Sequence, residues 1–197
     1  MTALAHWRLV RQMSLDLVVG PMWAGKSSHI VGKIRRYRAI GWDVLVVVHP
    51  LDTRYGTQVV STHDKEQLHA LAVEDIASLQ ANPAYQSAQL VVIEEAQFFK
   101  GLYEFVKTAV ETDNKHVLCV GLDGDANRKP FGDVLALVPL CDSITKIQSL
   151  CVECKDGTAA LFTHRMLPSE AQIQVGAEES YVPLCRKHYL AKNSGSH

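Results

Sequence analysis

The residues with the clearest chemistry lie near the N-terminus, in a short segment rich in glycine. Residues 20–27 fit the pattern G-x-x-x-x-G-K-S of a phosphate-binding loop, or P-loop. In this pattern backbone N–H groups point at a phosphate chain, the lysine places a charge near the β- and γ-phosphates, and the serine hydroxyl reaches Mg²⁺. The residues are Gly20, Pro21, Met22, Trp23, Ala24, Gly25, Lys26 and Ser27. They predict a site for a nucleotide phosphate chain.

The flanks of this loop agree with that interpretation. The apolar run Leu15–Val19 predicts a buried strand, and residues 26–40 have helical spacing. Bound phosphates would therefore sit at a helix N-terminus. The alternative is a glycine-rich turn that only joins strand to helix, and the agreement of the motif with both flanks disfavours it.

Two carboxylates follow another apolar run further along the chain. Leu90–Ile93 predicts a buried strand, and Glu94 and Glu95 come directly after it. Successive strand residues point to opposite sides, so the two side chains should do different work. We expect Glu94 to reach the water shell of Mg²⁺ and Glu95 to accept a proton from an attacking hydroxyl. Alternatively, both acids cap the following helix.

A metal site is predicted near the C-terminus by two spaced pairs. Cys151 and Cys154 form C-x-x-C, and Cys185 and His188 form C-x-x-H. Together they predict a closed tetrahedral Cys₃His site for a structural zinc ion, with coincidental cysteines as the alternative. The two remaining of the five cysteines, Cys119 and Cys141, have the character of small core residues.

Composition narrows the class of protein. The 197 residues are 47% hydrophobic and 21% charged, which is ordinary for one globular core with a small appendage. A net charge of −1 gives no global field for nucleic acid or an anionic membrane, so neither is expected as a partner. No apolar run approaches the roughly 20 residues of a membrane span, and no secretory signal is evident.

Alternating apolar strands and helices predict an α/β fold. We expect a P-loop (RecA-like) parallel sheet that is flanked by helices, together with a small C-terminal zinc-binding lobe. Besides the segments above, strands are expected at residues 44–48, 117–120 and 144–150, and helices at residues 71–79 and 102–112, with a chain break at Pro83. The expected organisation is a flexible N-terminus (1–13), a P-loop α/β core (14–149), a zinc-binding domain (150–191) and a flexible tail (192–197).

These elements together make the chain resemble the type II thymidine kinases. The resemblance runs from about Leu15 to Tyr189 and is specific, because its motifs occur in the family's order. They are the P-loop, D-T-R-Y at 52–55, T-H-D at 62–64, E-A-Q-F-F at 95–99, L-D-G at 122–124, R-K-P-F-G at 128–132, L-V-P-L at 137–140, the zinc pairs, Thr163 and Tyr181.

The resemblance implies transfer of the ATP γ-phosphate to the 5′-hydroxyl of thymidine. Glu95 would be the general base, while Lys26 and Arg54 would stabilise the moving phosphoryl group. Ser27 would bind Mg²⁺, with Asp52 and Glu94 nearby. Residues 158–181 resemble the family's lasso loop, which closes over the nucleoside. The implied nucleoside pocket consists of Met22, Phe98, Leu122, Phe131, Thr163, Ile173, Val175, Gly176 and Tyr181.

The resemblance also implies feedback inhibition by dTTP, a homotetramer or homodimer, and a cytoplasmic enzyme. Three positions depart from many relatives. Glu94 replaces an aspartate, which leaves direct or water-mediated metal contact open. Ala126 replaces an aromatic residue, so a looser pocket is expected, and His188 replaces a cysteine. A P-loop ATPase acting on nucleic acid and a non-catalytic nucleotide-binding module are the alternative functions.

Overall fold

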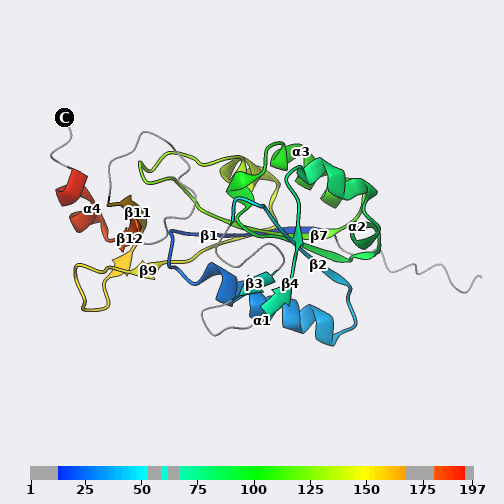
Figure 1. Ribbon diagram of the computed structural model, residues 1–197, viewed down its shortest axis with the longest axis horizontal. Helices are drawn as coiled ribbons and strands as arrows, with labels where there is room; N and C mark the ends of the chain where they lie inside the picture. The colour runs from blue at the N-terminus through cyan, green and yellow to red at the C-terminus, as the bar shows by residue number, and fades with distance from the viewer. Residues whose placement is uncertain (1–12, 53–58, 62–66, 167–179, 194–197) are drawn as a thin grey trace, which may run out of the picture.

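The computed structural model describes residues 13–52, 59–61, 67–166 and 180–193. Its centre is a six-stranded sheet with the order β5-β2-β6-β7-β1-β8, in which every neighbouring pair is parallel (Figure 1). The strands are β1 (Ser14–Val19), β2 (Val44–Val48), β5 (Leu71–Ala72), β6 (Leu90–Ile93), β7 (His116–Gly121) and β8 (Ser143–Lys146). The inner strands β2 and β6 are apolar throughout, as is typical of strands in a sheet that is covered on both faces.

Helices cover the two faces, as the alternation along the chain predicts. Helix α1 (Lys26–Ala39) packs Ile30 and Ile34 on one face, against Val18 of β1. On the other face, α3 (Leu102–Glu111) packs with Leu17. Figure 1 shows α1 and α3 on opposite sides of the sheet. Three short helices pack on the same face of the sheet as α3. They are η2 (Ile76–Ala81), α2 (Pro83–Ser87) and η4 (Val134–Leu140).

The helix expected at residues 71–79 is wrong in its first half. Leu71–Ala72 instead pairs with β2 as strand β5, and the 3₁₀ helix η2 begins only at Ile76. The carboxylate of Asp75 accepts the N–H of Ala77 at 3.0 Å, which caps the helix at that point. Pro83 does not simply break the chain. It occupies the first turn of α2, where its missing N–H is harmless.

The strand expected at residues 144–150 divides between two sheets. Its first part is β8, at the edge of the main sheet, and its second part is β9 (Ser149–Leu150). Strand β9 pairs with β10 (Ala159–Ala160), and β11 (Phe162–Arg165) pairs with β12 (Tyr181–Leu184), followed by α4 (Arg186–Asn193). These elements form a small lobe at one end of the molecule (Figure 1). A further antiparallel pair joins β3 (Val59–Ser61) and β4 (Gln67–His69).

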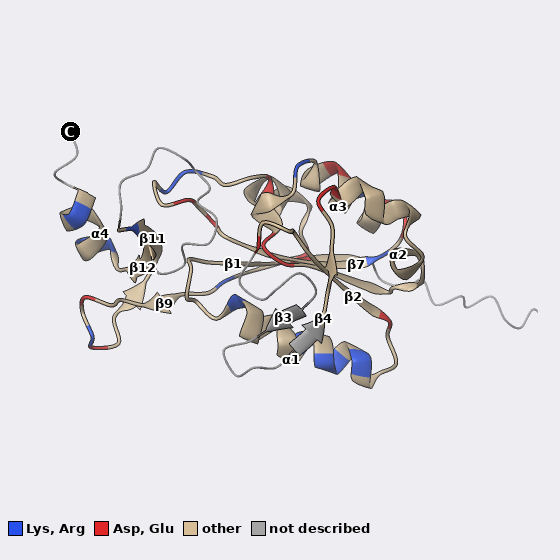
Figure 2. Ribbon diagram, viewed as in Figure 1, with Lys and Arg blue, Asp and Glu red and all other residues tan. Residues whose placement is uncertain are grey.

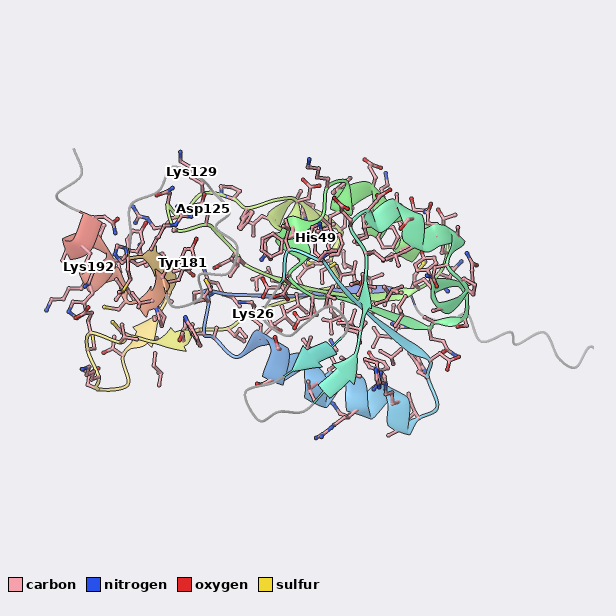
Figure 3. The ribbon with its side chains drawn as sticks, viewed as in Figure 1. Lys26, His49, Asp125, Lys129, Tyr181 and Lys192 are labelled. Atoms are coloured by element: carbon pink, nitrogen blue, oxygen red, sulfur yellow. The ribbon has the colours of Figure 1, made fainter. Side chains whose placement is uncertain are left out.

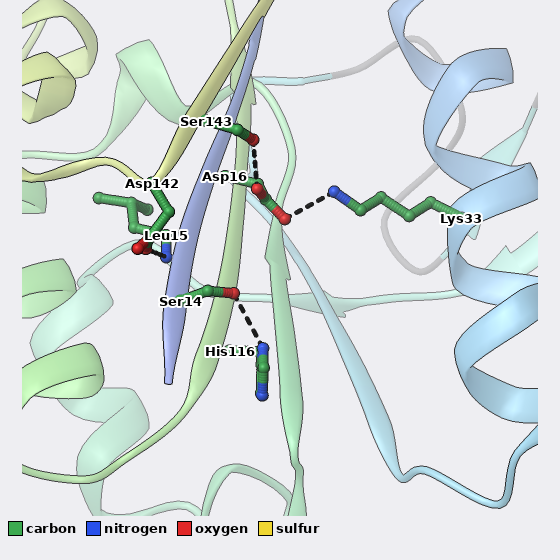
Figure 4. A network of polar contacts seen from close by, with 7 residues as sticks. All are labelled: Ser14, Leu15, Asp16, Lys33, His116, Asp142 and Ser143. Atoms are coloured by element: carbon green, nitrogen blue, oxygen red, sulfur yellow. Dashed lines mark hydrogen bonds and ion pairs between the residues drawn. The ribbon is translucent and has the colours of Figure 1, made fainter. Parts of the chain in front are cut away.

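A polar network ties α1 and β8 to β1 (Figure 4). Lys33 of α1 donates to Asp16 at 2.6 Å, and Ser143 of β8 also donates to Asp16. Burial opposes ionisation of this carboxyl, but the bonds from Lys33 and Ser143 outweigh it and lower the pKa of Asp16. The network therefore fixes α1 against β1, the two elements between which the P-loop lies.

The surface of α1 is basic toward its C-terminal end, where Arg36 and Arg38 occupy the last turn (Figure 2). Cations at that end are favourable for the helix dipole. Among the described residues, no helix has both the length and the apolar character to cross a membrane.

Candidate functional site

The P-loop connects β1 to α1 and wraps around its own lysine. Gly25 has a left-handed backbone (φ 76°) just before α1, and Trp23 shares that conformation (φ 64°). Lys26 is 7% exposed, and its Nζ donates to the carbonyl oxygens of Pro21 at 2.9 Å and Gly20 at 3.2 Å. A side chain at Gly20 would overlap the carbonyl of Ile147. The segment thus has the tight turn and the lysine placement that phosphate binding requires.

Strand register brings Glu95 to the same edge of the sheet as this loop. Strand β7 lies between β6 and β1, with Ile93 opposite Cys119 and Val19 opposite Gly121. Glu95, two residues beyond Ile93, is therefore level with Gly121 and with the start of the P-loop. Two strand spacings separate them, about 10 Å in the sheet plane. A nucleoside and a phosphate chain can meet across such a gap.

The backbone turns sharply at Glu95, which is 5% exposed and left-handed (φ 47°). Strand alternation therefore does not decide how the two acids point, because the strand ends at Ile93. Glu95 precedes only the three-residue 3₁₀ helix η3 (Ala96–Phe98), and its side chain makes no capping bond. The helix-capping alternative is accordingly not supported for Glu95.

The three residues expected near Mg²⁺ follow three different strands. Glu94 is 2% exposed, and its N–H bonds to the carbonyl of Val47 at the end of β2. Asp52 follows β2, where its N–H bonds to the carbonyl of His49 at 2.9 Å. Ser27 lies in the first turn of α1. A hydroxyl and two carboxylates supply the oxygen donors that Mg²⁺ prefers, so the donor set fits that ion.

Gln97 lies within the E-A-Q-F-F motif at 95–99, and the sequence alone assigns it no role. Its side chain is 3% exposed, its Nε2 donates to Glu95 Oε2, and its Oε1 accepts the N–H of Leu122 at 3.0 Å. It thus joins the loop after β6 to the loop after β7. Its place two residues after the candidate base was the only sequence signal available.

His49 is a second residue that the sequence did not single out. It is buried directly after β2, with its ring 5.1 Å from Phe99 and 6.0 Å from Phe98, measured between centroids. Its Nδ1 accepts the N–H of Leu51 at 3.1 Å, and burial lowers its pKa. His49, which is labelled in Figure 3, is therefore a neutral ring that packs against Phe98 and Phe99.

Part of the expected nucleoside pocket is brought together by these loops. Phe98 and Phe131 meet edge to face at 5.8 Å between ring centres, and the Leu122 N–H is bonded to the side chain of Gln97, the residue before Phe98. Met22 and Thr163 are in direct contact, since the Met22 N–H donates to Thr163 Oγ1 at 3.0 Å. Arg54, Ile173, Val175 and Gly176 lie outside the described residues.

The P-loop is also bonded directly to the small lobe. In addition to the Met22–Thr163 bond, Trp23 Nε1 donates to the carbonyl of Tyr181 at 3.2 Å, and Ser149 Oγ donates to the Trp23 carbonyl at 3.0 Å. Figure 3 labels Lys26 at the start of α1 and Tyr181 on the lobe. Tyr181 thus contacts the P-loop through its backbone carbonyl. The loop that would hold the phosphates is therefore shared between sheet and lobe.

A second contact ties the lobe to the loop after β7. Tyr189 OH donates to the Ala126 carbonyl at 2.6 Å, and the Arg128 guanidinium lies 4.8 Å from the Tyr189 ring centre. The loop after β7 is thus bonded to the lobe through the backbone of Ala126, a contact that the identity of its side chain does not predict. Whether the small side chain loosens the pocket stays a prediction.

The four predicted zinc ligands converge in the lobe, with donor atoms within 4.8 Å of one another. A zinc tetrahedron has S···S edges of about 3.8 Å and S···N edges of about 3.6 Å. Cys154 and Cys185 sulfurs are 3.8 Å apart, and His188 Nδ1 lies 3.3 to 3.5 Å from the three sulfurs. These residues could therefore hold a zinc ion. Cys119 is instead a buried core residue whose thiol pKa is raised by burial.

A parallel sheet with this loop at its carboxyl edge defines the class, a P-loop nucleotide-binding protein with a Cys₃His lobe. The family model described as thymidine kinase matches residues 13–189. The chain belongs to the thymidine kinase family, as its motifs indicated.

Named relatives span plants, animals and viruses. A thymidine kinase of Oryza sativa is 36% identical over 180 residues, covering 89% of this chain and 66% of its own length. The cytosolic thymidine kinase of Homo sapiens is 35% identical, covering 92% of this chain and 75% of its own. The thymidine kinase of Monkeypox virus is 32% identical, covering 89% of this chain and 96% of its own length. The chain thus spans just under two thirds of the rice protein and nearly all of the viral one.

Proposed function

We propose that this protein is an ATP-dependent thymidine kinase that forms dTMP for nucleotide salvage, with deoxyuridine as a possible second acceptor. One observation carries the proposal. Lys26 of the P-loop and the carboxylate of Glu95 are both buried at the same edge of the sheet, in a member of the thymidine kinase family. This pairs a phosphate-binding group with a proton acceptor, as phosphoryl transfer to an alcohol requires.

In the proposed reaction, the 5′-oxygen of thymidine forms a bond to the γ-phosphorus, and the bond to the bridging oxygen breaks to release ADP. The hydroxyl proton passes to the Glu95 carboxylate. Lys26 and Arg54 stabilise the charge on the transferred group, which is where most catalysis of this kind arises. Ser27, Asp52 and Glu94 would hold Mg²⁺ bound with ATP, and that ion neutralises phosphate charge.

The acceptor site in this proposal is an apolar slot closed by the lobe. Phe98, Leu122 and Phe131 would contact the base from the sheet side, while Met22 lies between acceptor and phosphates. Thr163, Ile173, Val175, Gly176 and Tyr181 would contribute from the lobe and its lasso.

Several further features belong to the same proposal. The Cys₃His cluster would hold structural zinc, because the lobe buries too few apolar residues to be stable alone. We propose residues 14–149 as the kinase core and 150–191 as the zinc-binding domain. A homotetramer or homodimer, feedback inhibition by dTTP and a cytoplasmic location follow from the family, and the human relative is named as cytosolic.

A coupled assay that measures ADP release tests the proposal. The protein is mixed with ATP and Mg²⁺, and with thymidine, deoxyuridine, deoxycytidine or single-stranded DNA in separate reactions. We expect turnover with thymidine, recovery of dTMP, and no stimulation by DNA. ADP release that requires DNA and ignores all three nucleosides would instead establish the nucleic-acid ATPase alternative.

A further inference from the structure

Two side chains of the lobe, those of Arg165 and Tyr181, are bonded to each other across a pair of strands. The residues lie directly opposite in the register of β11 and β12, so their side chains share one face of the pair. Arg165 Nε donates to the Tyr181 hydroxyl oxygen at 3.1 Å, and the guanidinium carbon lies 5.3 Å from the centre of the Tyr181 ring. The phenol is therefore held both at its oxygen and over its ring by one cation.

This face of the strand pair is the one that contacts the P-loop. Thr163, two residues before Arg165, shares the face by strand alternation, and its hydroxyl accepts the N–H of Met22 at 3.0 Å. The carbonyl of Tyr181 likewise accepts the indole N–H of Trp23 at 3.2 Å. Tyr181, which is labelled in Figure 3, is 9% exposed. Its phenol is thus buried on the P-loop side of the lobe.

The bond from Arg165 decides where the phenolic proton can point. A guanidinium has donors and no acceptor, so the Tyr181 oxygen must accept and its own proton is directed away from Arg165. Among the residues that the structure describes, none accepts that proton in return. Because a buried donor without an acceptor is costly, this hydroxyl is suited to donate to a molecule bound between the lobe and the P-loop.

We propose that Arg165 is a positioning residue for thymidine, and that it acts by aiming the Tyr181 O–H at an acceptor oxygen of the nucleoside. The inference rests on the proposed function, in which Tyr181 lines the thymidine site. A hydroxyl that already accepts a bond from a cation is polarised and becomes a stronger donor. A hydroxyl whose direction is fixed before binding also loses less freedom when the nucleoside arrives. Arg165 should therefore raise the affinity for thymidine.

Arg165→Met and Arg165→Gln separate the hydrogen bond from the charge. Both variants remove the guanidinium, but glutamine places an amide nitrogen where arginine has Nε, whereas methionine places a methyl carbon there. We expect Arg165→Met to weaken thymidine binding about 3-fold to about 10-fold, the usual effect of losing one hydrogen bond. Arg165→Gln should stay within about twofold of the unchanged chain. Calorimetry with thymidine measures both affinities and needs no turnover.

A double-mutant cycle with Tyr181→Phe tests whether Arg165 acts through the phenol. Tyr181→Phe keeps the ring, removes the hydroxyl and should weaken thymidine binding by a similar factor. If Arg165 acts only through that hydroxyl, adding Arg165→Met to Tyr181→Phe should cause no further loss. In Arg165→Met alone, KM for thymidine should rise while kcat changes less than about twofold. Retained affinity for a non-hydrolysable ATP analogue would show that the P-loop is intact in this variant.

The matched control is Arg186→Met, on the opposite face of the same strand. The Arg186 guanidinium lies 4.9 Å from the ring centre of Phe162, which alternates with Thr163 along β11. The Phe162 ring lies 5.1 Å from that of Tyr189 in α4, so this face is turned away from the P-loop. The control removes an arginine from an aromatic ring of the lobe, and we expect it to leave thymidine affinity unchanged.

Equal losses in Arg165→Met and Arg165→Gln would assign the effect to charge and overturn the role of the hydrogen bond. Losses that add in the double variant, or a loss in Arg186→Met as large as in Arg165→Met, would overturn it as well. If the cycle behaves as expected but the unchanged chain transfers no phosphate to thymidine, the link to the nucleoside stands and the proposed reaction fails. Full turnover with no effect of Arg165→Met on thymidine affinity would leave the proposed function standing and refute this inference.

Discussion

The bond between Met22 and Thr163 makes a prediction about ATP binding that a nucleoside contact alone would not make. Thr163 is 5% exposed and belongs to β11 of the lobe, yet its hydroxyl accepts a backbone N–H of the P-loop at 3.0 Å. Thr163→Val keeps the shape of the side chain and removes this acceptor. The Met22 N–H then has lost its partner in a half-buried site.

The magnitude follows from the cost of an unsatisfied buried donor, about 1 to 3 kcal/mol. If ATP binds only the loop conformation that Thr163 stabilises, the ratio of that conformation to its alternatives falls by the same free energy. The corresponding loss of affinity is at most about 5-fold to about 150-fold, and is reached in full where the alternatives predominate. We expect values near the lower end, because Met22 is only partly buried and water can replace the hydroxyl.

Calorimetry with a non-hydrolysable ATP analogue and Mg²⁺, in the absence of nucleoside, measures this effect. Thr163→Ser is the matched control, since it keeps the hydroxyl and should bind the analogue as the unchanged chain does. Equal affinity in all three proteins would refute the reasoning and confine Thr163 to the acceptor pocket. Weaker binding in the serine variant alone would assign the effect to packing of the methyl group, which valine retains.

Three further predictions concern the base, the metal cluster and the fold. Glu95→Gln should lower kcat by about 10²-fold to 10⁴-fold with thymidine affinity nearly unchanged, and loss of both would assign Glu95 to structure. Cys185→Ser should reduce bound zinc, measured by metal analysis, and should weaken both ATP and thymidine binding, whereas an effect on thymidine alone would show that the lobe does not support the P-loop. Lys33→Met should lower the melting temperature at neutral pH. Because the pKa of Asp16 is lowered in the fold, this loss should shrink as pH falls through and below the usual aspartate range near 4, and a loss independent of pH would contradict the ion pair.

The central sheet was predictable because its signals are local. Runs such as Leu90–Ile93 are apolar throughout, which indicates strands covered on both faces, and the structure places a strand at the same residues. The P-loop fixes a strand before it and a helix after it. The zinc pairs were also predictable, since their spacing is a property of the ligands and not of the surrounding fold.

Errors arose where a distant partner decides the local structure. Leu71–Ala72 has apolar residues that fit either a helix or a strand, and the open edge of β2 turns them into β5. The Met22–Thr163 bond joins residues separated by 141 positions, so no local pattern could predict it. The role of Gln97 could not be predicted for the same reason, because it depends on Leu122 at the end of a neighbouring strand.

Because of these distant contacts, the lobe helps to hold the conformation of the P-loop. Trp23 holds a left-handed backbone, which costs a residue other than glycine about 1 kcal/mol or more. The same residue makes two hydrogen bonds to the lobe side, one through its indole N–H to Tyr181 and one through its carbonyl from Ser149. At about 1 kcal/mol each, these bonds offset the strain.

The conformation of the phosphate-binding loop therefore depends on where the lobe lies. The lobe in turn has a core of only a few apolar side chains around Cys151, Leu184 and Tyr189, so its position depends on the cluster of metal-binding residues. A chain of contacts thus runs from His188 and the three cysteines, through β11 and β12, to Met22 and Trp23. We therefore expect the Cys₃His cluster to support the proposed ATP site as well as the proposed thymidine site, and removal of zinc to weaken the affinities for ATP and thymidine together.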